Sequence, residues 1–206
     1  MPHPHPHEHS HAHEHDHANA NDHAHANDHA HTHAHEHDHE HDTHSQAPRG
    51  PFRPRGELKP GDGRGRLLYL DAFSGAAGDM TIAALLDLGV PLAVVADAVS
   101  GLPGLTGFSL DAFSREKSGI VGTGFDVTVE PGQPQRSYAA IRTMLAESSL
   151  AAPVRALAER IFARLAQAEA DVHRVALDDV HFHEVGAVDA IVDIVGAAAC
   201  FSHLQA

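Results

Sequence analysis

The chain has a single cysteine among its 206 residues, Cys200, which lies in an apolar helical context. One cysteine excludes a framework of disulfides within the chain, and it excludes a zinc site built from cysteines. There is no run of about 18 apolar residues, so we expect no membrane-crossing helix. The N-terminus has neither a basic start nor an apolar stretch, so we expect no secretory signal and a cytoplasmic location.

Basic residues are also scarce. Acidic residues outnumber them by 28 to 14, which gives a formal net charge of −14. Nine of the acids lie in the first 44 residues, and six of the bases lie in residues 45–66. The rest of the chain is acidic and has no basic stripe, so we expect no binding to nucleic acid.

Histidine, by contrast, is abundant. Four of its 22 residues are His173, His181, His183 and His203. The other 18 lie in residues 1–44, where they alternate with Pro, Ala, Asn, Glu and Asp. Such a segment buries too little apolar area to offset chain ordering, so residues 1–48 are predicted to be a disordered tail. Imidazole suits divalent zinc, copper and nickel, so this tail is predicted to collect such ions. Its candidate ligands are His11, His13, His15, His17, His31, His33, His35, His37, His39 and His41.

The tail has two plainer interpretations. A purification tag is an uninterrupted histidine run, which this alternating pattern is not. A solvated linker with accidental histidine bias stays open. The interspersed acids add electrostatic attraction for a cation, so the pattern indicates a transition metal without indicating which one.

Residues 49–66 are rich in Pro, Gly and Arg and are predicted to be a disordered linker. Residues 67–206 then form one compact domain with room for a single core, in which Cys200 is a small core residue. The predicted order is one strand, two helices, two strands and three helices. That order is typical of an α+β or mixed α/β fold.

Local signals place these elements. We expect a buried strand over residues 67–73 and a hairpin of 108–116 with 120–130, turning at Lys117-Ser118-Gly119. Helices are expected from Asp79 to Gly89, from Pro91, after Ser137 and from Pro153. The helix from Pro153 is predicted to bury Val154, Leu157, Ile161, Leu165 and Ala168. A final helix over 185–204 is apolar on more than one face, so we expect residues 190–206 to contact a partner or a second copy.

The sequence VHFHEVGAVDAIVDIVG, residues 180–196, holds two imidazoles and three carboxylates. On an extended chain His181 and His183 point to the same side, and Glu184 follows at the start of a helix. Asp189 and Asp193 share a face of that helix, a like-charge pair that a common cation would stabilise. All five are candidate metal ligands, with His183 and Glu184 as candidate catalytic residues. Alternatively, the aspartates cap or bridge neighbouring elements and the histidines are ordinary loop residues.

A second motif is DAFSGAAGDM, residues 71–80. An acid, a glycine-rich turn and a helix start present backbone N–H groups to a phosphate, so Ser74, Gly75 and Gly78 are candidate cofactor-binding residues. Asp71 and Asp79 bracket the loop and are candidate catalytic residues that hold a cation. The motif lacks the P-loop and dinucleotide signatures, so a plain strand-to-helix turn is the favoured alternative. We expect both aspartates to converge with the carboxylates and imidazoles of residues 181–193, because buried carboxylates without a shared cation are costly.

Three stretches, LYLDAFSGAAGDM, AEADVH and HFHEVGAVDAIVDIVG, resemble the LarC family of nickel-insertion proteins over about residues 67–204. The resemblance implies a nickel chelatase of the lyase class. Such an enzyme inserts nickel into pyridinium-3,5-bisthiocarboxylic acid mononucleotide and forms the nickel-pincer nucleotide of lactate racemase. It also implies CTP and a divalent cation as cofactors, bound through a C-terminal half that follows this region, and a C-terminal product as partner.

Two functions remain at this stage. In the first, the chain is the N-terminal part of a cofactor-metallating enzyme, which the ordered motifs favour. In the second, it is a non-catalytic nickel-binding and storage module that hands metal to a partner, which the tail favours.

Overall fold

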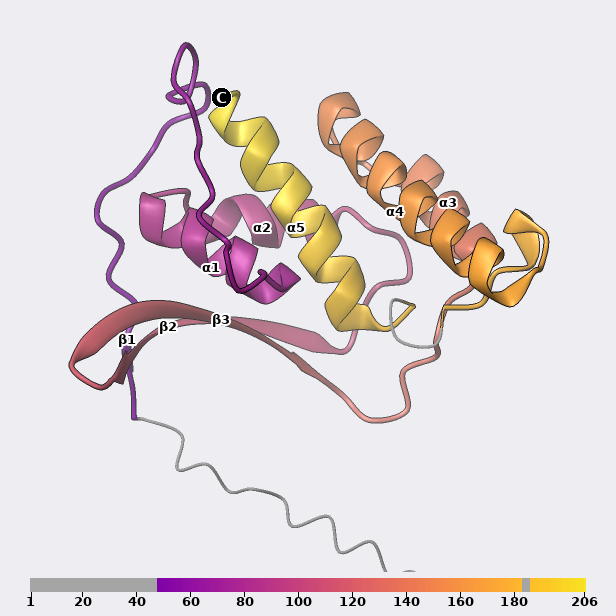
Figure 1. Cartoon of the computed structure of the whole chain (residues 1–206), viewed down its shortest axis with the longest axis horizontal. Coiled ribbons are helices and arrows are strands. Elements are labelled where there is room, and N and C mark those ends of the chain that lie inside the picture. Colours follow the sequence, from indigo (N-terminus) through magenta and orange to yellow (C-terminus); the bar gives the residue numbers. More distant parts are fainter. Residues whose placement is uncertain (1–47, 183–185) are drawn as a thin grey trace, which may run out of the picture. The chain divides into compact units, whose positions relative to one another are not determined.

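The computed structural model describes residues 48–182 and 186–206 (Figure 1). Its elements are β1 (Arg49–Pro51), α1 (Gly78–Leu88), α2 (Leu92–Ser100), β2 (Phe108–Lys117), β3 (Ile120–Val129), α3 (Tyr138–Glu147), α4 (Ala152–His173), the short 3₁₀ helix η1 (Leu177–Asp179) and α5 (Val188–Leu204). The three strands form one antiparallel sheet in chain order. The predicted α+β class is therefore confirmed, while the predicted tail, up to residue 47, lies outside the described residues. In the described ranges, no helix has both the length and the apolar character needed to cross a membrane.

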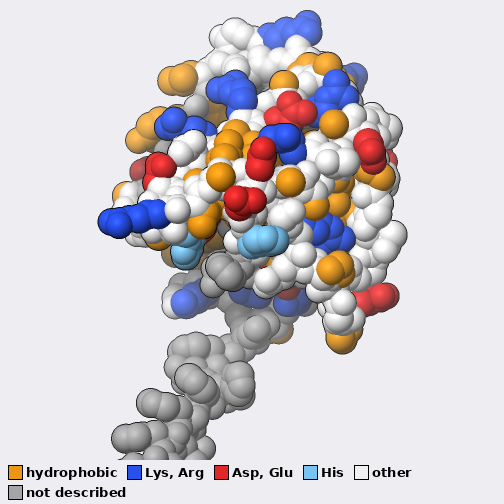
Figure 2. Space-filling view, turned by 90° about the vertical axis from the view of Figure 1, so that its right-hand side faces the viewer, with side chains coloured by type: hydrophobic (Ala, Val, Ile, Leu, Met, Phe, Trp, Pro, Cys, Tyr) orange, Lys and Arg blue, Asp and Glu red, His pale blue; other side chains and the backbone are white. Residues whose placement is uncertain are grey.

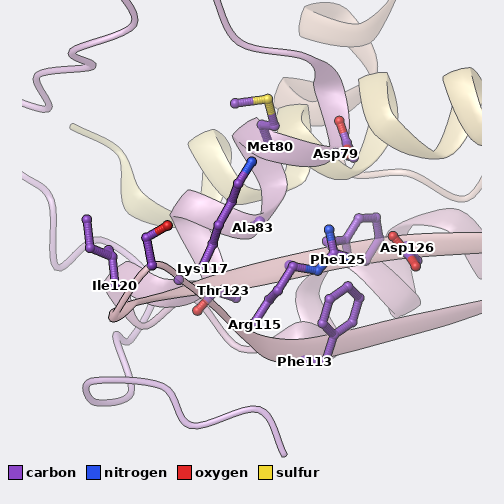
Figure 3. Close-up of a pocket in the computed structure, with 13 residues that line it drawn as sticks. Asp79, Met80, Ala83, Phe113, Arg115, Lys117, Ile120, Thr123, Phe125 and Asp126 are labelled. Atoms are coloured by element: carbon purple, nitrogen blue, oxygen red, sulfur yellow. The ribbon is translucent and has the colours of Figure 1, made fainter. Parts of the chain in front are cut away.

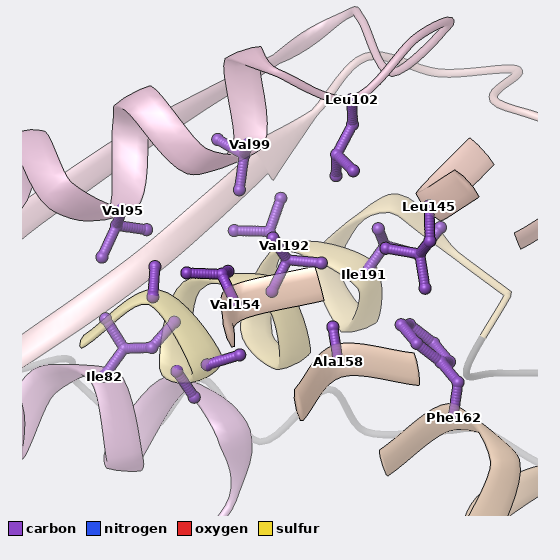
Figure 4. Close-up of a cluster of buried hydrophobic side chains, with 14 of the residues drawn as sticks. Ile82, Val95, Val99, Leu102, Leu145, Val154, Ala158, Phe162, Ile191 and Val192 are labelled. Carbon is purple, nitrogen blue, oxygen red and sulfur yellow. The ribbon is translucent and has the colours of Figure 1, made fainter. Parts of the chain in front are cut away.

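Helix α5 lies at the centre of the core, in contact with α1, α2, α4 and β3. Ile191, Val192 and Val195 on α5 are fully buried, and Figure 4 shows α5 packed between α2 and α4. Gly196 permits this packing, since a Cβ there would lie 2.9 Å from both Ile82 on α1 and Val95 on α2. The domain itself therefore covers most of these apolar side chains, although Ile194 and Phe201 are only partly buried. The expected contact of residues 190–206 with a partner stays a prediction.

Most local signals for turns and caps are confirmed, but Asp79 is not the N-cap of α1, which begins at Gly78 after Ala77. Strands β2 and β3 meet at Ser118 and Gly119, which both have the positive φ that a tight hairpin turn requires. Gly89 ends α1 in the left-handed conformation, with φ of 119°. Ser137 caps α3, where its hydroxyl accepts a hydrogen bond of 3.2 Å from the Ala140 N–H.

The predicted buried strand over residues 67–73 is wrong. This segment forms no strand, and Leu67, Tyr69 and Phe73 are 90%, 77% and 93% exposed. An apolar run becomes a strand only where a neighbouring strand pairs with it, and the described residues pair none with this segment. Instead, the third strand of the sheet is β1, which lies in residues that were predicted from their composition to be a linker.

Residues 49–66 are held by specific contacts rather than disordered. Strand β1 pairs with β2, with Arg49 opposite Arg115. Further along, the Leu58 N–H donates to the Gly89 carbonyl at 2.8 Å, and the Gly63 N–H donates to a carbonyl at the end of α5 at 2.9 Å. Pro and Gly content describes how an isolated segment behaves, so it gave no sign of these tertiary bonds.

Helix α4 buries a row of residues that only partly matches the predicted face. Val154 is buried as predicted, but the buried row continues through Ala158, Phe162 and Ala166. These residues are spaced by four, and their small members let α4 lie close to α5 (Figure 4). The predicted Ala168 is exposed, because the helix faces α5 along a row one position away from the predicted one.

Candidate functional site

Carboxylates from three elements line a pocket of about 320 Å³. Asp79 lies in the first turn of α1, Asp189 lies in the first turn of α5 with Asp193 one turn later, and Asp126 lies on β3. The pocket thus joins one residue of the SGAAGDM motif to two residues of the VDAIVD motif. Helix N-termini carry partial positive charge, which offsets part of the repulsion between these acids.

Gly78 allows the two motifs to approach this closely. A Cβ added at Gly78 would lie 2.5 Å from Cβ and Oδ2 of Asp193, a distance that no side chain tolerates without movement. The backbone N–H of Asp79 donates a hydrogen bond to the Asp193 carboxylate. In this structure Gly78 therefore acts as a packing residue between α1 and α5.

Asp193 is the most perturbed acid of the pocket. Burial, followed by the nearby charges of Asp79 and Asp189, raises the pKa of Asp193 to about 6. Its Oδ1 is buried and has no hydrogen-bond partner in the described part of the chain. Asp126 differs, because Arg49 pairs with it. Three of the four acids thus lack a basic partner within the described residues, an arrangement that favours a bound cation or a shared proton.

The pocket is not a complete metal site by itself. Across residues 48–182 and 186–206, no three His, Cys, Asp or Glu side chains are placed to share one metal ion. His183 and Glu184, predicted as ligands and catalytic residues, lie outside the described residues, as do the tail histidines.

The start of the HFHE motif is anchored away from this pocket. His181 is exposed and pairs with Ser137 in an isolated antiparallel bridge. Phe182 points inward, is 2% exposed, and packs against Tyr138 and Phe162 with ring centroids 6.2 and 6.4 Å apart. The burial of Phe182 was not predicted from the sequence. In an extended chain, however, the alternation that places the two histidines on one side places Phe182 on the other.

Asp71, Ser74 and Gly75 lie on exposed chain before α1. Gly75 has a φ of 86°, and its N–H donates to the Ala72 carbonyl at 2.9 Å, which makes a tight turn. None of the three lines the carboxylate pocket. Of the predicted site residues, the structure therefore brings Asp79, Asp189 and Asp193 together, without Asp71 or His181.

A larger cavity of about 560 Å³ adjoins the carboxylate pocket (Figure 3). It lies between α1 and the β2–β3 hairpin, and both hollows are lined by Asp79, Phe125 and Asp126. On the other side it is lined by Arg115 and Lys117 of β2. The sequence-based interpretation missed this basic side completely.

The hairpin sets Asp111 directly opposite Asp126, because its turn contains only Ser118 and Gly119. The predicted turn of Lys117, Ser118 and Gly119 would have set Asp111 opposite Phe125, so the sequence-based prediction gave no sign of this pair. Like charges opposite one another are unfavourable, so such a pair indicates a cation nearby. In the structure Arg49 supplies it: its guanidinium contacts both carboxylates and lies 4.1 Å from the Phe113 ring centroid.

The face that carries α3 and α4 has a different character. Figure 2 shows Lys and Arg side chains interspersed with Asp and Glu on this face. Arg142 pairs with Asp178 at 3.0 Å, and His173 lies 3.2 Å from Glu169. Exposed pairs of this kind are typical of solvated helix surfaces. The carboxylate pocket and its adjoining cavity are therefore the better candidate site.

Comparisons with known proteins agree on one family. The family model described as "Nickel insertion protein" matches residues 68–206. Relatives named "Putative nickel insertion protein" from Geobacter sp. (strain M21) and Geobacter metallireducens are 52% and 55% identical over 140 residues. Each alignment covers 68% of this chain and 36% of the relative. A relative of the same name from Thermomicrobium roseum is 48% identical over 131 residues, 64% of this chain and 32% of its own length. The chain thus spans about a third of the length of these relatives, and no solved structure matches it.

Proposed function

Because this chain belongs to the nickel insertion protein family, we propose that it takes part in inserting nickel into an organic cofactor precursor. The proposed precursor is pyridinium-3,5-bisthiocarboxylic acid mononucleotide, and the product is the nickel-pincer nucleotide of lactate racemase. The reaction makes the chain part of a nickel chelatase of the lyase class. CTP and a divalent cation enter, in this proposal, through the portion of the family proteins that this chain does not span.

The observation that carries the proposal is the carboxylate pocket, which joins two sequence motifs far apart in the chain. Asp79, Asp189 and Asp193 present oxygens that attract a divalent cation. A site with few ligands releases its metal easily, which suits delivery better than storage. Sulfur ligands bind nickel more strongly than carboxylates do, so transfer from this pocket to a thiocarboxylate acceptor is favourable.

A second function, nickel storage without catalysis, is supported by a separate observation. The 18 histidines of residues 1–44 provide far more imidazole than one insertion site needs. In that case the chain binds nickel and passes it to another protein. The two functions differ in whether this chain contributes groups to the insertion step.

An insertion assay separates them. The purified chain is incubated with the precursor, nickel and CTP, with and without the C-terminal portion of a family protein, and the nickel nucleotide is measured by mass spectrometry. We expect product only with both parts, and roughly tenfold less with Asp189→Asn, because the exposed Asp189 carboxylate lines the pocket without being part of the core.

Asp97→Asn is the matched control, since Asp97 is an exposed aspartate on α2 outside the pocket. If Asp189→Asn inserted nickel as fast as the unmodified chain, the pocket would not be the insertion site. If no combination gave product while the chain still bound nickel, storage would be the better function.

A further inference from the structure

The two edges of the sheet are built differently. The edge formed by β1 is three residues long and ends at Pro51, which has no N–H to donate to a further strand. The other edge is β3, which is ten residues long, pairs with β2 residue for residue without a bulge, and contains no Lys, Arg or Pro. Short strands, prolines, bulges and lysines are the features that keep an edge from pairing with another chain. The β1 edge has two of these features, and the β3 edge has none.

The outer edge of β3 is unpaired within the described residues. Among the strands of that part of the chain, β3 is the last in the sheet and pairs with β2 alone. Alternate residues of such a strand turn their N–H and C=O groups away from the sheet. The two-residue turn at Ser118 and Gly119 makes Lys117 and Ile120 a hydrogen-bonded pair, so the backbone groups of Val121 point outward. Groups of this kind are available to a further strand.

A groove follows this edge. Every residue of β3 from Gly122 to Thr128 lines the larger cavity or the carboxylate pocket, and Asp79 lines both. Consecutive residues of a strand point to opposite faces, so hollows lined by all of them lie alongside the strand rather than over one face. Figure 3 shows this run of β3, with Asp79 and Met80 of α1 on the other side of the groove. The free edge of β3 is therefore open along most of its length.

The groove carries opposite charges at its two ends. Lys117 lines it beside the hairpin turn, whereas Asp126, Asp189 and Asp193 line it toward the end of β3, where Glu130 follows. A two-fold axis through the middle of β3 would bring the basic end of each groove to the acidic end of the same groove in a second copy. Opposite charges attract across such a contact, so the groove is complementary to itself.

We infer that the chain forms a two-fold symmetric dimer in which the β3 strands of two copies pair antiparallel and join the two sheets into one. With the axis at Phe125, Ile120, which is 75% exposed in the single chain, lies opposite Glu130 of the second copy. Asp126 then lies opposite Gly124, so no like charges meet directly. The carboxylate pocket, which is lined by this half of β3, lies at the dimer interface. Such a dimer forms whether or not the chain inserts nickel.

Sedimentation equilibrium of the full chain measures the dimer, with a chelator present so that histidines cannot join two copies through a metal. Lys117 and Glu130 lie at opposite ends of the ten-residue strands, ~30 Å apart, so they cannot pair within one copy. We expect Lys117→Glu and Glu130→Lys each to weaken the dimer at least about tenfold, because like charges then meet at both ends of the interface. The double variant should return to within about threefold of the unmodified chain, because opposite charges meet again across the axis.

Val121→Pro tests the strand pairing itself. Val121 is 64% exposed and its N–H points away from β2, so proline there removes a donor from the free edge without breaking a bond inside the sheet. Val121→Ala is the matched control, because it shortens the same side chain and keeps the N–H. We expect Val121→Pro to weaken the dimer at least about tenfold and Val121→Ala to weaken it less than about threefold, with both proteins folded by circular dichroism.

Three results would overturn the inference: a chain that stays monomeric as its concentration rises, a dimer that Val121→Pro leaves intact, or single charge reversals that the double variant fails to restore. A fourth would give the edge to a different occupant. If the chain associated only with the C-terminal portion of a family protein, and Val121→Pro broke that complex, the β3 edge would bind a strand of that portion instead of a second copy.

Discussion

At the scale of single residues, Asp193 links the site to stability. Its carboxyl has a pKa of about 6 in the folded chain against an ordinary value of 3.8, so the native state favours the protonated form. The stability from this preference is fully present below about pH 4 and is lost as the pH rises through about 6. We expect Asp193→Asn to raise the free energy of unfolding at about pH 7.5 by about 1 kcal/mol, a value reduced for solvent screening of this half-buried group.

Urea unfolding at about pH 5 and about pH 7.5, with a chelator present, measures this effect. Asp97→Asn serves again as the control, because its side chain lies on the exposed face of α2. A gain in stability that is the same at both pH values would contradict the assignment of the effect to ionisation of Asp193.

Cys200 is also shifted by burial, but in a different role. It is fully buried on α5, and burial raises the pKa of its thiol to about 12. The thiol therefore stays protonated at neutral pH, and a protonated thiol is a poor metal ligand and nucleophile. This agrees with the predicted role of Cys200 as a small core residue.

At the scale of elements, the contact between α1 and α5 depends on Gly78. In a helix interior alanine is favoured over glycine by about 1 kcal/mol, but Gly78 is the first residue of α1, and an alanine Cβ there would overlap Asp193. We expect Gly78→Ala to lower the free energy of unfolding by about 2 kcal/mol, since overpacking outweighs helix propensity. Chemical denaturation measures it, with Gly56→Ala as a control in open space. If Gly78→Ala proved as stable as the unmodified chain, the two helices would not be so tightly apposed.

Features set by a few neighbouring residues were predictable from the sequence. Gly89, Ser137 and the Ser118-Gly119 turn each act through their own backbone geometry or a hydrogen bond to a near neighbour, so their effect is visible in the sequence. The alternation of apolar residues likewise identified β2 and β3. Two of the four acids of the carboxylate pocket, Asp189 and Asp193, were predicted by the same local reasoning, because their spacing places them on one helix face.

Most features set by distant partners were not predictable, although Asp79 was expected to lie near Asp189 and Asp193 and lines the same pocket. Residues 67–73 have the composition of a buried strand, but a strand needs a neighbour that the local sequence does not specify. The same holds for β1, whose pairing with β2 joins positions more than 60 residues apart. The basic side of the cavity was not predicted for the same reason. Arg115 can be recognised as a lining residue only once the fold places α1 over the hairpin.

At the scale of the whole molecule, the histidine tail is expected to add nickel-binding capacity. We predict that the full chain binds several more nickel ions, weakly and reversibly, than a variant lacking residues 1–44. The added binding should fade as the pH falls through about 6.5, because protonated imidazole does not bind metal. Truncation after residue 44 rather than 66 keeps β1 and the bonds of Leu58 and Gly63 intact.

Calorimetry with nickel on both proteins gives the stoichiometry. Equal stoichiometry would rule out the tail as a nickel-collecting segment. We further expect the truncated chain to support insertion as well as the full chain when nickel is saturating, because a tethered tail acts by raising the local metal concentration. Loss of activity at saturating nickel would instead make the tail part of the site.

We propose that the C-terminal portion of the family proteins docks on the exposed segment 67–73 of this chain. The helix first predicted for that contact, α5, buries most of its apolar side chains inside the domain. Residues 67–73 instead lie outside any strand and carry exposed apolar side chains, a kind of surface that is typical of protein contacts. The family match includes this segment from residue 68, while the matched part is about a third of the relatives. We therefore propose that the partner is the portion of the relatives that lies outside the match.

The double substitution Tyr69→Ser with Phe73→Ser should weaken association with that portion by at least about tenfold, because large apolar side chains contribute most to such interfaces. Both side chains are exposed, so the stability of the free chain should not change. Val172→Ser is the matched control, as Val172 is 77% exposed on α4, away from this segment. Sedimentation of each variant with the C-terminal portion measures the association. If the double variant bound as tightly as the unmodified chain, another surface would have to carry the contact, and the exposure of residues 67–73 would need a different cause.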